Sequence, residues 1–137
     1  MPEVDFMVVC DYVRVDGGVM HMIAGGIDTI YARQVPSAQN LGVALRLLLT
    51  RNECDRDHQM ELIFQDEDGA AFARVEGQFQ VSYPERVPPG WRAYALLSLN
   101  IGVPLPHYGV YSLELLVDGQ AKKSVPLRVT PVAELTR

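Results

Sequence analysis

Apolar and polar residues alternate along most of the chain, and the alternation is clearest between residues 106 and 129. Every second residue from Tyr111 to Val117 is apolar, which places these side chains on one face of an extended segment. The pattern stops at an Asp-Gly-Gln sequence, residues 118–120, and then resumes. Asp-Gly between two alternating segments is a strong signal for a tight turn. The sequence therefore predicts a β-hairpin here, and we expect the other elements to be strands packed around it.

The same alternation predicts strands in most of the remaining chain. Residues 41–50 have apolar side chains at five successive odd positions, which favours a strand although leucine is a good helix former. A strand over residues 19–32 is interrupted by Gly25 and Gly26, and paired glycines inside a strand are typical of a bulge, a sharp bend or a close backbone approach; we favour the bulge. Besides the two arms of the hairpin, the predicted strands cover residues 6–15, 19–32, 41–50, 58–65, 70–81 and 92–101.

Proline-containing segments separate these strands. They cover residues 33–40, 82–91 and 102–109, and we expect loops there because proline lacks the amide hydrogen that a sheet ladder needs. The longest of them, residues 82–91, is predicted to cross between two sheets. About eight strands without a convincing helix indicate one all-β domain over residues 1–137, an antiparallel β-sandwich, with a closed barrel as the alternative.

Composition narrows the classes of function. The net charge is −5 and Lys122-Lys123 is the only adjacent pair of basic residues, whereas nucleic-acid-binding domains carry a basic face. No segment approaches the roughly 20 apolar residues of a membrane span, and the acidic start of the chain is unlike a secretory signal. We therefore expect a cytoplasmic protein that binds neither nucleic acid nor membrane, with Cys10 and Cys54 as free thiols rather than a disulfide.

Candidate residues for chemistry are few. Cys54 and His58 are four apart, but on a loop that runs into a strand this spacing does not bring thiolate and imidazole together. Two ligands are also too few for a zinc site. The acidic residues at 55–57 and 66–68 lack the calcium-loop pattern and fit turns better. We expect no catalytic residue, no metal site and no cofactor.

Three aromatic residues near the second crossing form the candidate binding surface. Trp91, the only tryptophan, has Tyr83 and Tyr94 as neighbours in sequence, and the three offer a platform for a protein partner or a sugar. The interpretation that we favour for Trp91 itself is a plug. It follows Pro88 and Pro89, and large aromatic side chains are mostly buried, so we expect it to fill the open end of the sandwich.

The segment Gly109-Val110-Tyr111-Ser112-Leu113 resembles the G-x-Y-x-C segment that begins strand F of immunoglobulin domains. The resemblance implies an immunoglobulin-like sandwich of about seven to eight strands, in which the hydroxyl of Tyr111 bonds back to nearby backbone. Leu113 replaces the cysteine of the inter-sheet disulfide, and Trp91 does not lie in a strand interior. The likeness is therefore to the immunoglobulin-like fold in general rather than to antibody domains.

A second resemblance covers nearly the whole chain. The segments DGGVMHMIAGGIDTIYA, TRNECDRDHQMELIFQDEDG, PPGW and LNIGVPLPHYGVYSLELLVDG are similar to a family of small bacterial proteins of unknown function. The resemblance implies a bacterial cytoplasmic protein and supplies no catalytic residue. We expect a non-catalytic module that binds a protein partner or its own copy through exposed strand edges. Binding of a small ligand or carbohydrate by Tyr83, Trp91 and Tyr94 is the alternative.

Overall fold

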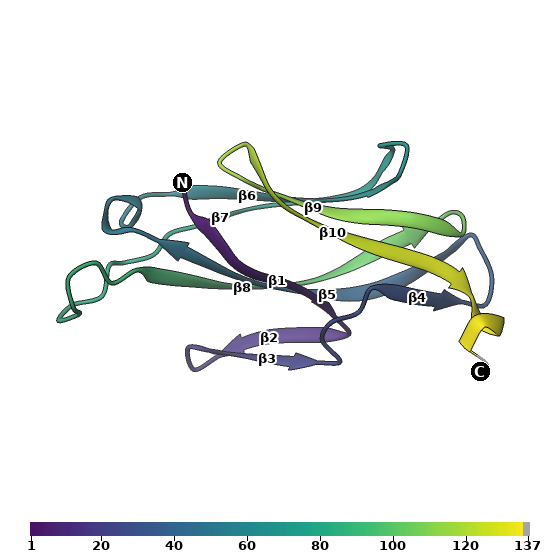
Figure 1. The fold of residues 1–137 in the computed structure, drawn as a ribbon, viewed down its shortest axis with the longest axis horizontal. Helices are drawn as coiled ribbons and strands as arrows, with labels where there is room; N and C mark the ends of the chain where they lie inside the picture. The colour runs from purple at the N-terminus through teal and green to yellow at the C-terminus, as the bar shows by residue number, and fades with distance from the viewer. Residues whose placement is uncertain (136–137) are drawn as a thin grey trace.

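Ten β-strands build the structure, a computed structural model that describes residues 1–135 (Figure 1). No α-helix occurs in that part of the chain, and two short 3₁₀ turns complete the secondary structure. The elements are β1 (Glu3–Cys10), β2 (Tyr12–Asp16), β3 (Val19–Ile23), β4 (Thr29–Ala32), β5 (Ser37–Leu49), η1 (Arg51–Glu53), β6 (His58–Asp66), β7 (Ala71–Phe79), β8 (Ala93–Leu105), β9 (Gly109–Val117), β10 (Gln120–Pro131) and η2 (Val132–Leu135).

Two sheets face each other and enclose the main core (Figure 1). Sheet A has the strand order β1-β5-β8, and sheet C has the order β4-β10-β9-β6-β7. The apolar side chains that alternate along the strands point between the sheets, as Leu45 and Leu47 of β5 and Leu113 and Leu115 of β9 illustrate, each with 0% of its surface exposed. The burial expected from the alternation in these two segments is therefore confirmed.

The predicted hairpin of residues 106–129 is β9 and β10. Val117 pairs with Gln120, so the turn consists of Asp118 and Gly119, whose φ angles are 50° and 79°. Two successive residues with positive φ are the mark of the type I′ turn, whose twist suits a hairpin. The β9–β10 pair lies in the interior of sheet C, between β6 and β4.

Tyr111 fixes the start of β9. Its side chain is fully buried, and its hydroxyl donates a hydrogen bond to the carbonyl of His107 at 2.7 Å and accepts one from the His107 amide at 3.1 Å. The ring stacks on Phe64 of β6, with 5.0 Å between centroids. The prediction that the Tyr111 hydroxyl bonds to nearby backbone is confirmed.

A third sheet, sheet B, consists of β2 and β3 alone and packs on the outer face of sheet A (Figure 1). Val13 of β2 and Ala44 of β5 are fully buried there, with Cys10, in a small second core. The side-chain amide of Asn100 in β8 accepts from the Val13 amide at 3.2 Å and donates to the Val13 carbonyl at 2.8 Å. Asp16 pairs with Val19, so a turn of Gly17 and Gly18 closes this hairpin.

The predictions for residues 6–15 and 19–32 are wrong in one respect, because each segment forms two strands instead of one. The first divides at Asp11, where the chain leaves sheet A for sheet B. The second divides at residues 24–28, where the chain leaves sheet B for sheet C. In both places a change of sheet interrupts a strand-like sequence.

Gly25 and Gly26 lie in the second of these crossings, so they are not a bulge inside a strand. A Cβ atom on Gly25 would lie 2.4 Å from the sulfur of Met22, so the Met22 side chain would have to shift to make room for it. Gly26 has a φ of 92° and its amide donates to the Val9 carbonyl at 2.9 Å. The favoured bulge is wrong, while the close approach and the bend expected of paired glycines are present.

Two of the expected loops are shorter than predicted. β5 begins at Ser37 and β8 continues to Leu105, and these two residues pair with each other. Pro104 lies in β8, an edge strand of sheet A, and edge strands are where sheets tolerate proline. The third loop, residues 82–91, crosses from sheet C to sheet A as predicted.

The strand count and the strand directions also differ from expectation. There are ten strands rather than seven to eight, and β4 pairs with β10 in parallel, so the fold is not wholly antiparallel. The all-β class itself is confirmed.

Candidate functional site

The candidate aromatic residues lie around the crossing from β7 to β8. Trp91 is 55% exposed and Tyr94 is 45% exposed, while Tyr83 is half-buried and its hydroxyl donates to the Trp91 carbonyl at 2.7 Å. The prediction that Trp91 plugs the end of the sandwich is wrong. The Trp91 amide donates to the Pro88 carbonyl at 3.1 Å, and this tight turn through Gly90 keeps the indole outside the core.

Two shallow grooves have Trp91 in their lining. The larger has a volume of about 520 Å³ and the smaller about 200 Å³, and Trp91 and Arg92 line both. The lining of the larger groove comprises Thr50, Arg51, Tyr83, Val87, Pro88, Pro89, Gly90, Trp91 and Arg92, and that of the smaller comprises Ser82, Pro84, Trp91, Arg92, Ala93 and Tyr94. We name the residues of both linings the Trp91 surface.

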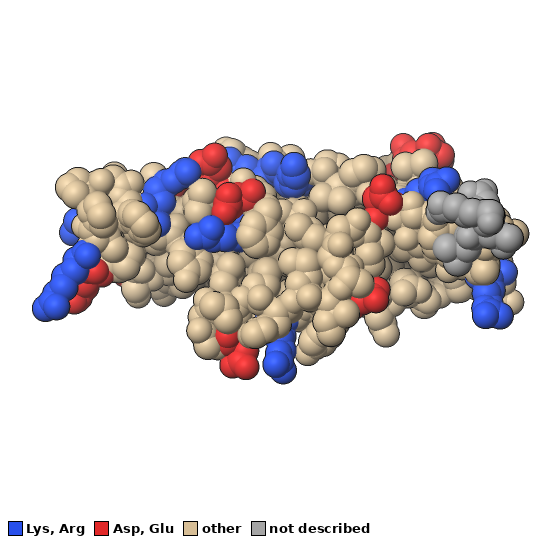
Figure 2. Space-filling view, turned by 60° about the horizontal axis from the view of Figure 1, so that its bottom comes forward, with Lys and Arg blue, Asp and Glu red and all other residues tan. Residues whose placement is uncertain are grey.

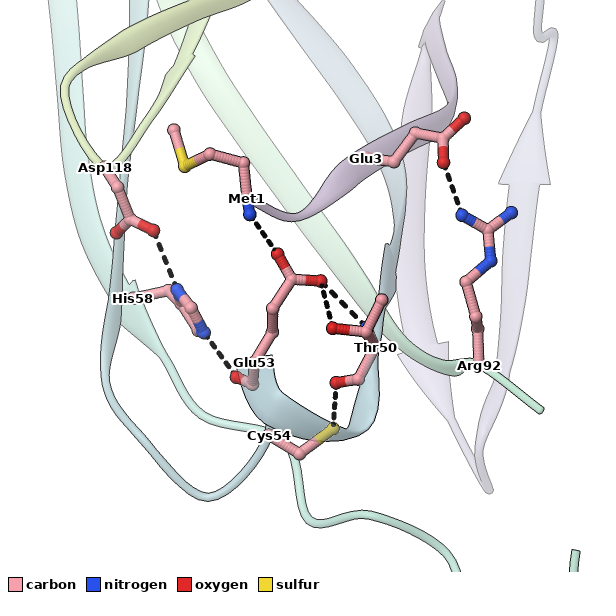
Figure 3. Close-up of polar contacts among 8 residues, drawn as sticks. All are labelled: Met1, Glu3, Thr50, Glu53, Cys54, His58, Arg92 and Asp118. Carbon is pink, nitrogen blue, oxygen red and sulfur yellow. Dashed lines mark hydrogen bonds and ion pairs between the residues drawn. The ribbon is translucent and has the colours of Figure 1, made fainter. Parts of the chain in front are cut away.

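Arginine side chains stack on two of the aromatic rings. The guanidinium of Arg51 lies 5.2 Å from the ring centroid of Tyr83, and that of Arg46 lies 4.5 Å from the centroid of Tyr94. Arg46 also pairs with Asp5 at 2.9 Å, and Arg92 pairs with Glu3 (Figure 3). Within residues 1–135 no carboxylate lies at ion-pair distance from Arg51. The Arg51 guanidinium is therefore stacked on Tyr83, and its charge is not paired with a carboxylate of the described residues.

The sequence did not indicate that Arg51 lines this surface or that Arg46 stacks on Tyr94. The two arginines belong to β5 and to η1, far from Trp91 along the chain, and only the β5–β8 pairing brings them near it. Arg46 pairs with Leu96 and Leu48 pairs with Tyr94, so Arg46 and Tyr94 are diagonal neighbours on one face. The sequence signal would have been the single arginine that interrupts the apolar run of residues 41–49.

A second polar cluster surrounds η1 (Figure 3). His58 is buried, with Nδ1 2.8 Å from the Asp118 carboxylate and Nε2 2.5 Å from the Glu53 carbonyl. Both neighbours are acceptors, so both ring nitrogens donate and the imidazole is cationic. Burial lowers the pKa of His58, but the bonds to the Glu53 carbonyl and to Asp118 outweigh burial and hold the pKa above its usual value. A histidine held in this way supports structure and has no free nitrogen for catalysis.

Cys54 uses a different partner from His58. Its thiol donates to the Thr50 carbonyl at 3.4 Å, and the Thr50 amide and hydroxyl donate to the Glu53 carboxylate (Figure 3). Burial, followed by the charges of Asp55 and Glu53, raises the pKa of Cys54. The thiol therefore stays protonated at neutral pH, and thiolate is the form that attacks substrates and binds metals. Within residues 1–135 no three His, Cys, Asp or Glu side chains are grouped to hold a metal ion.

Comparison with known proteins identifies a family and no activity. A family model described as a family of unknown function (DUF6941) matches residues 5–130, which is nearly the whole chain. No curated protein matches the chain. None of the helices in the described part of the chain is long and apolar enough to cross a membrane.

Proposed function

The chain belongs to this family of unknown function (DUF6941), and we propose that it is a non-catalytic module that binds a protein partner through the Trp91 surface. One observation carries the proposal. Trp91 exposes 55% of its side chain at the meeting of two grooves, with the half-exposed Tyr94 and the stacked Arg51 beside it. Tryptophan, tyrosine and arginine are the residue types that most often dominate the binding energy of protein interfaces.

The shape of the surface favours a protein segment over an enclosed small molecule. Pockets for small molecules bury about 70–90% of their ligand. Residues 88–92 line the larger groove and are themselves exposed, so the groove cannot surround a ligand to that extent. An extended peptide that lies across Trp91 and reaches into both grooves fits the surface better.

The charge of the surface favours an acidic partner segment. The Arg46 and Arg92 guanidinium groups already have the carboxylates of Asp5 and Glu3, which leaves Arg51 to attract a carboxylate of the partner. Aromatic stacking holds the Arg51 guanidinium in place, so less side-chain entropy is lost when it forms that bond. We therefore propose an extended segment that carries Asp or Glu next to an apolar residue.

Fluorescence tests the proposal directly, because Trp91 is the only tryptophan in the chain. Extended peptides with a central apolar residue followed by Glu, Gln or Lys are titrated while the Trp91 emission is recorded. We expect a saturable change with the Glu peptides and affinity that falls in the order Glu, Gln, Lys. Arg51→Glu should weaken binding of the Glu peptides by at least about tenfold and improve binding of the Lys peptides. Val110→Lys, which adds a charge at a 45% exposed position on β9, should leave both unchanged.

Carbohydrate binding is the second candidate, and the exposed indole is the observation that favours it, since a sugar ring can stack on an aromatic face. A glycan series measured with the same Trp91 emission distinguishes the two. A response to glycans and not to peptides would establish the second candidate against the first. No response to either series would contradict both.

We also propose that the fold is immunoglobulin-like. The order β1-β5-β8 corresponds to immunoglobulin strands A, B and E, and β6-β9-β10 corresponds to C, F and G, with the Tyr111 corner at the start of β9. On this scheme the β2–β3 hairpin is an insertion. A crystal structure with a different strand order in either sheet would overturn the assignment.

The bacterial cytoplasm is the setting that we propose. It is supported by the likeness to small bacterial proteins and by Cys10 and Cys54, which are both buried, unpaired thiols as expected in a reducing compartment. Fractionation of a source cell with an antibody against the chain would test this, and recovery outside the cytoplasm would contradict it.

A further inference from the structure

The β2–β3 hairpin exposes three large apolar side chains, far along the chain from the Trp91 surface, on a face that also carries Arg14, Asp16 and His21. Tyr12 is 48% exposed, Val19 is 55% exposed, and Ile23, at 61%, is the most exposed large apolar side chain in the described part of the protein. Figure 2 brings forward the underside of Figure 1, which carries the hairpin, and that face is mostly uncharged, with acidic and basic residues interspersed. A solvated surface hairpin does not need these apolar side chains.

One edge of the hairpin has no neighbour. Sheet B contains only β2 and β3. The Asn100 side chain bonds both backbone groups of Val13, so these groups point away from β3, and Val13 and its partner Met22 are a non-hydrogen-bonded pair. Because such pairs alternate along an antiparallel ladder, the backbone groups of Met22 and of Met20 point outward from β3. Asn100 thus satisfies the edge of β2, while the edge of β3 stays open.

The sequence of β3 is complementary to itself. It is Val-Met-His-Met-Ile. His21 is at the centre, a methionine lies on each side of it, and a β-branched apolar residue stands at each end. Two antiparallel copies that meet at His21 therefore place Val19 opposite Ile23 and Met20 opposite Met22, twice. The outward backbone groups of both methionines then complete hydrogen-bonded pairs, and apolar residues pack together on both sides of the central His21 pair.

β3 also lacks the features that keep edge strands apart. It contains no proline and no Asp, Glu, Lys or Arg. The edge strand β1 of sheet A carries Glu3 and Asp5, and the edge strand β7 of sheet C carries Arg74 and Glu76. Charges and prolines are the usual protection of edges against pairing with another chain.

We propose that β3 pairs with β3 of a second copy of this chain about a two-fold axis at His21, which creates a four-stranded sheet in the order β2-β3-β3-β2. The interface is isologous, because the same strand serves on both sides. It lies in sheet B and does not depend on the Trp91 surface.

Opposite charges at position 21 test the register. In the proposed pairing His21 faces His21 of the partner in a non-hydrogen-bonded pair, where side chains are closest. His21→Lys and His21→Glu should each weaken self-association by at least about tenfold, because each sets like charges opposite each other. An equimolar mixture of the two variants should restore a species of twice the mass of one chain, measured by sedimentation velocity over a concentration series of the full chain.

Two control variants keep the test specific. Val110→Lys adds a charge at an exposed position outside β3, and Trp91→Ala removes the exposed indole of the Trp91 surface, so both should associate like the unmodified chain. Circular dichroism verifies that every variant is folded. The proposal is overturned if the unmodified chain stays monomeric throughout the series, if the His21→Lys and His21→Glu variants do not associate when mixed, or if Trp91→Ala abolishes association.

Discussion

Two hairpins in this protein have nearly the same turn and very different surroundings. Gly17-Gly18 joins β2 to β3 with φ angles of 62° and 77°, and Asp118-Gly119 joins β9 to β10 with φ angles of 50° and 79°. The β9–β10 pair has β6 and β4 as neighbours, whereas the β2–β3 pair forms a sheet of its own. The same turn conformation therefore occurs in one hairpin that has a strand on each side and in another whose strand β3 has a free edge.

The consequences appear in the apolar side chains. In β9, Leu113 and Val117 have no exposed surface, while Val19 and Ile23 of β3 expose more than half of theirs. The residues of the turn determine that a hairpin forms, and the neighbouring strands determine whether its apolar side chains are buried. One hairpin stabilises the fold, and the other is left for a partner.

The largest expected effect separates the two hairpins by stability. Leu113→Ala empties a fully buried position between the sheets and should lower the free energy of unfolding by about 2–5 kcal/mol. Ile23→Ala, at a 61% exposed position, should change it by no more than about 0.5 kcal/mol. Chemical denaturation of dilute protein measures both. Similar losses of unfolding free energy from the two substitutions would show that the two hairpins do not differ in their contribution to stability.

The next effect concerns two tyrosines, one in each hairpin. Tyr111→Phe leaves the amide and the carbonyl of His107 without their partner and should cost about 1–3 kcal/mol of stability. Tyr12→Phe, on an exposed side chain, should have an effect within about 0.5 kcal/mol. An unchanged melting temperature for Tyr111→Phe would show that the corner does not support the fold.

The turn of the β9–β10 hairpin should contribute a pH dependence of stability, because Asp118 binds His58 there. His58 has a raised pKa, so its stabilisation is complete below its unfolded value of about 6.5 and is lost as the pH rises through the folded pKa. Burial raises the pKa of Asp118, but the Gln59 amide and His58 outweigh burial and lower it, so its stabilisation is lost as the pH falls through that lowered pKa.

Unfolding curves from about pH 3 to pH 9 check this dependence, in which stability should fall on the alkaline side and on the acid side. Asp118→Asn keeps a residue that tolerates positive φ and removes the charge, so its stability should vary less with pH above about 6.5. A variant profile as steep as that of the unmodified chain would rule out the Asp118–His58 pair as the cause.

The last effect concerns the attachment of the β2–β3 hairpin to sheet A. Asn100→Ala removes two hydrogen bonds to the Val13 backbone and should cost about 1 kcal/mol of stability. Amide hydrogen exchange should accelerate in β2 and β3 and remain unchanged in β9 and β10. Equal acceleration in both hairpins would mean that Asn100 supports the whole fold.

The strands could be predicted because alternation and turn residues are local features of the sequence. The bounds of the strands and the sheets that they join depend on contacts between distant segments and could not be predicted. The β9–β10 turn and the core positions of β5 follow from residues next to each other in sequence. The division of the first strand at Asp11 does not, because β1 and β2 share one alternation and differ only in the sheet that they join. The start of β5 at Ser37 could not be predicted because the first residues of β5 are mostly polar and resemble a loop. Their pairing with β8 makes them part of the strand.

The candidate site was predictable in its residue types and not in its exposure. Tyr83, Trp91 and Tyr94 stand out in the sequence, but the Pro88–Trp91 turn that keeps the indole outside is a matter of backbone geometry. Arg51 reaches Tyr83 only because the sheets pack as they do. The open edge of β3 could not be predicted from the sequence either. The side chains of β3 alternate in the same way as those of a strand that has a neighbour on each side.

The central claim, that β3 has a free edge made for a second copy, is tested most directly by amide exchange measured residue by residue at several protein concentrations. We predict that the Met20 and Met22 amides exchange rapidly in dilute protein and become protected as concentration rises, while the β9 amides are protected throughout. Rapid exchange of Met20 and Met22 at every concentration, or protection of both in dilute protein, would contradict the claim.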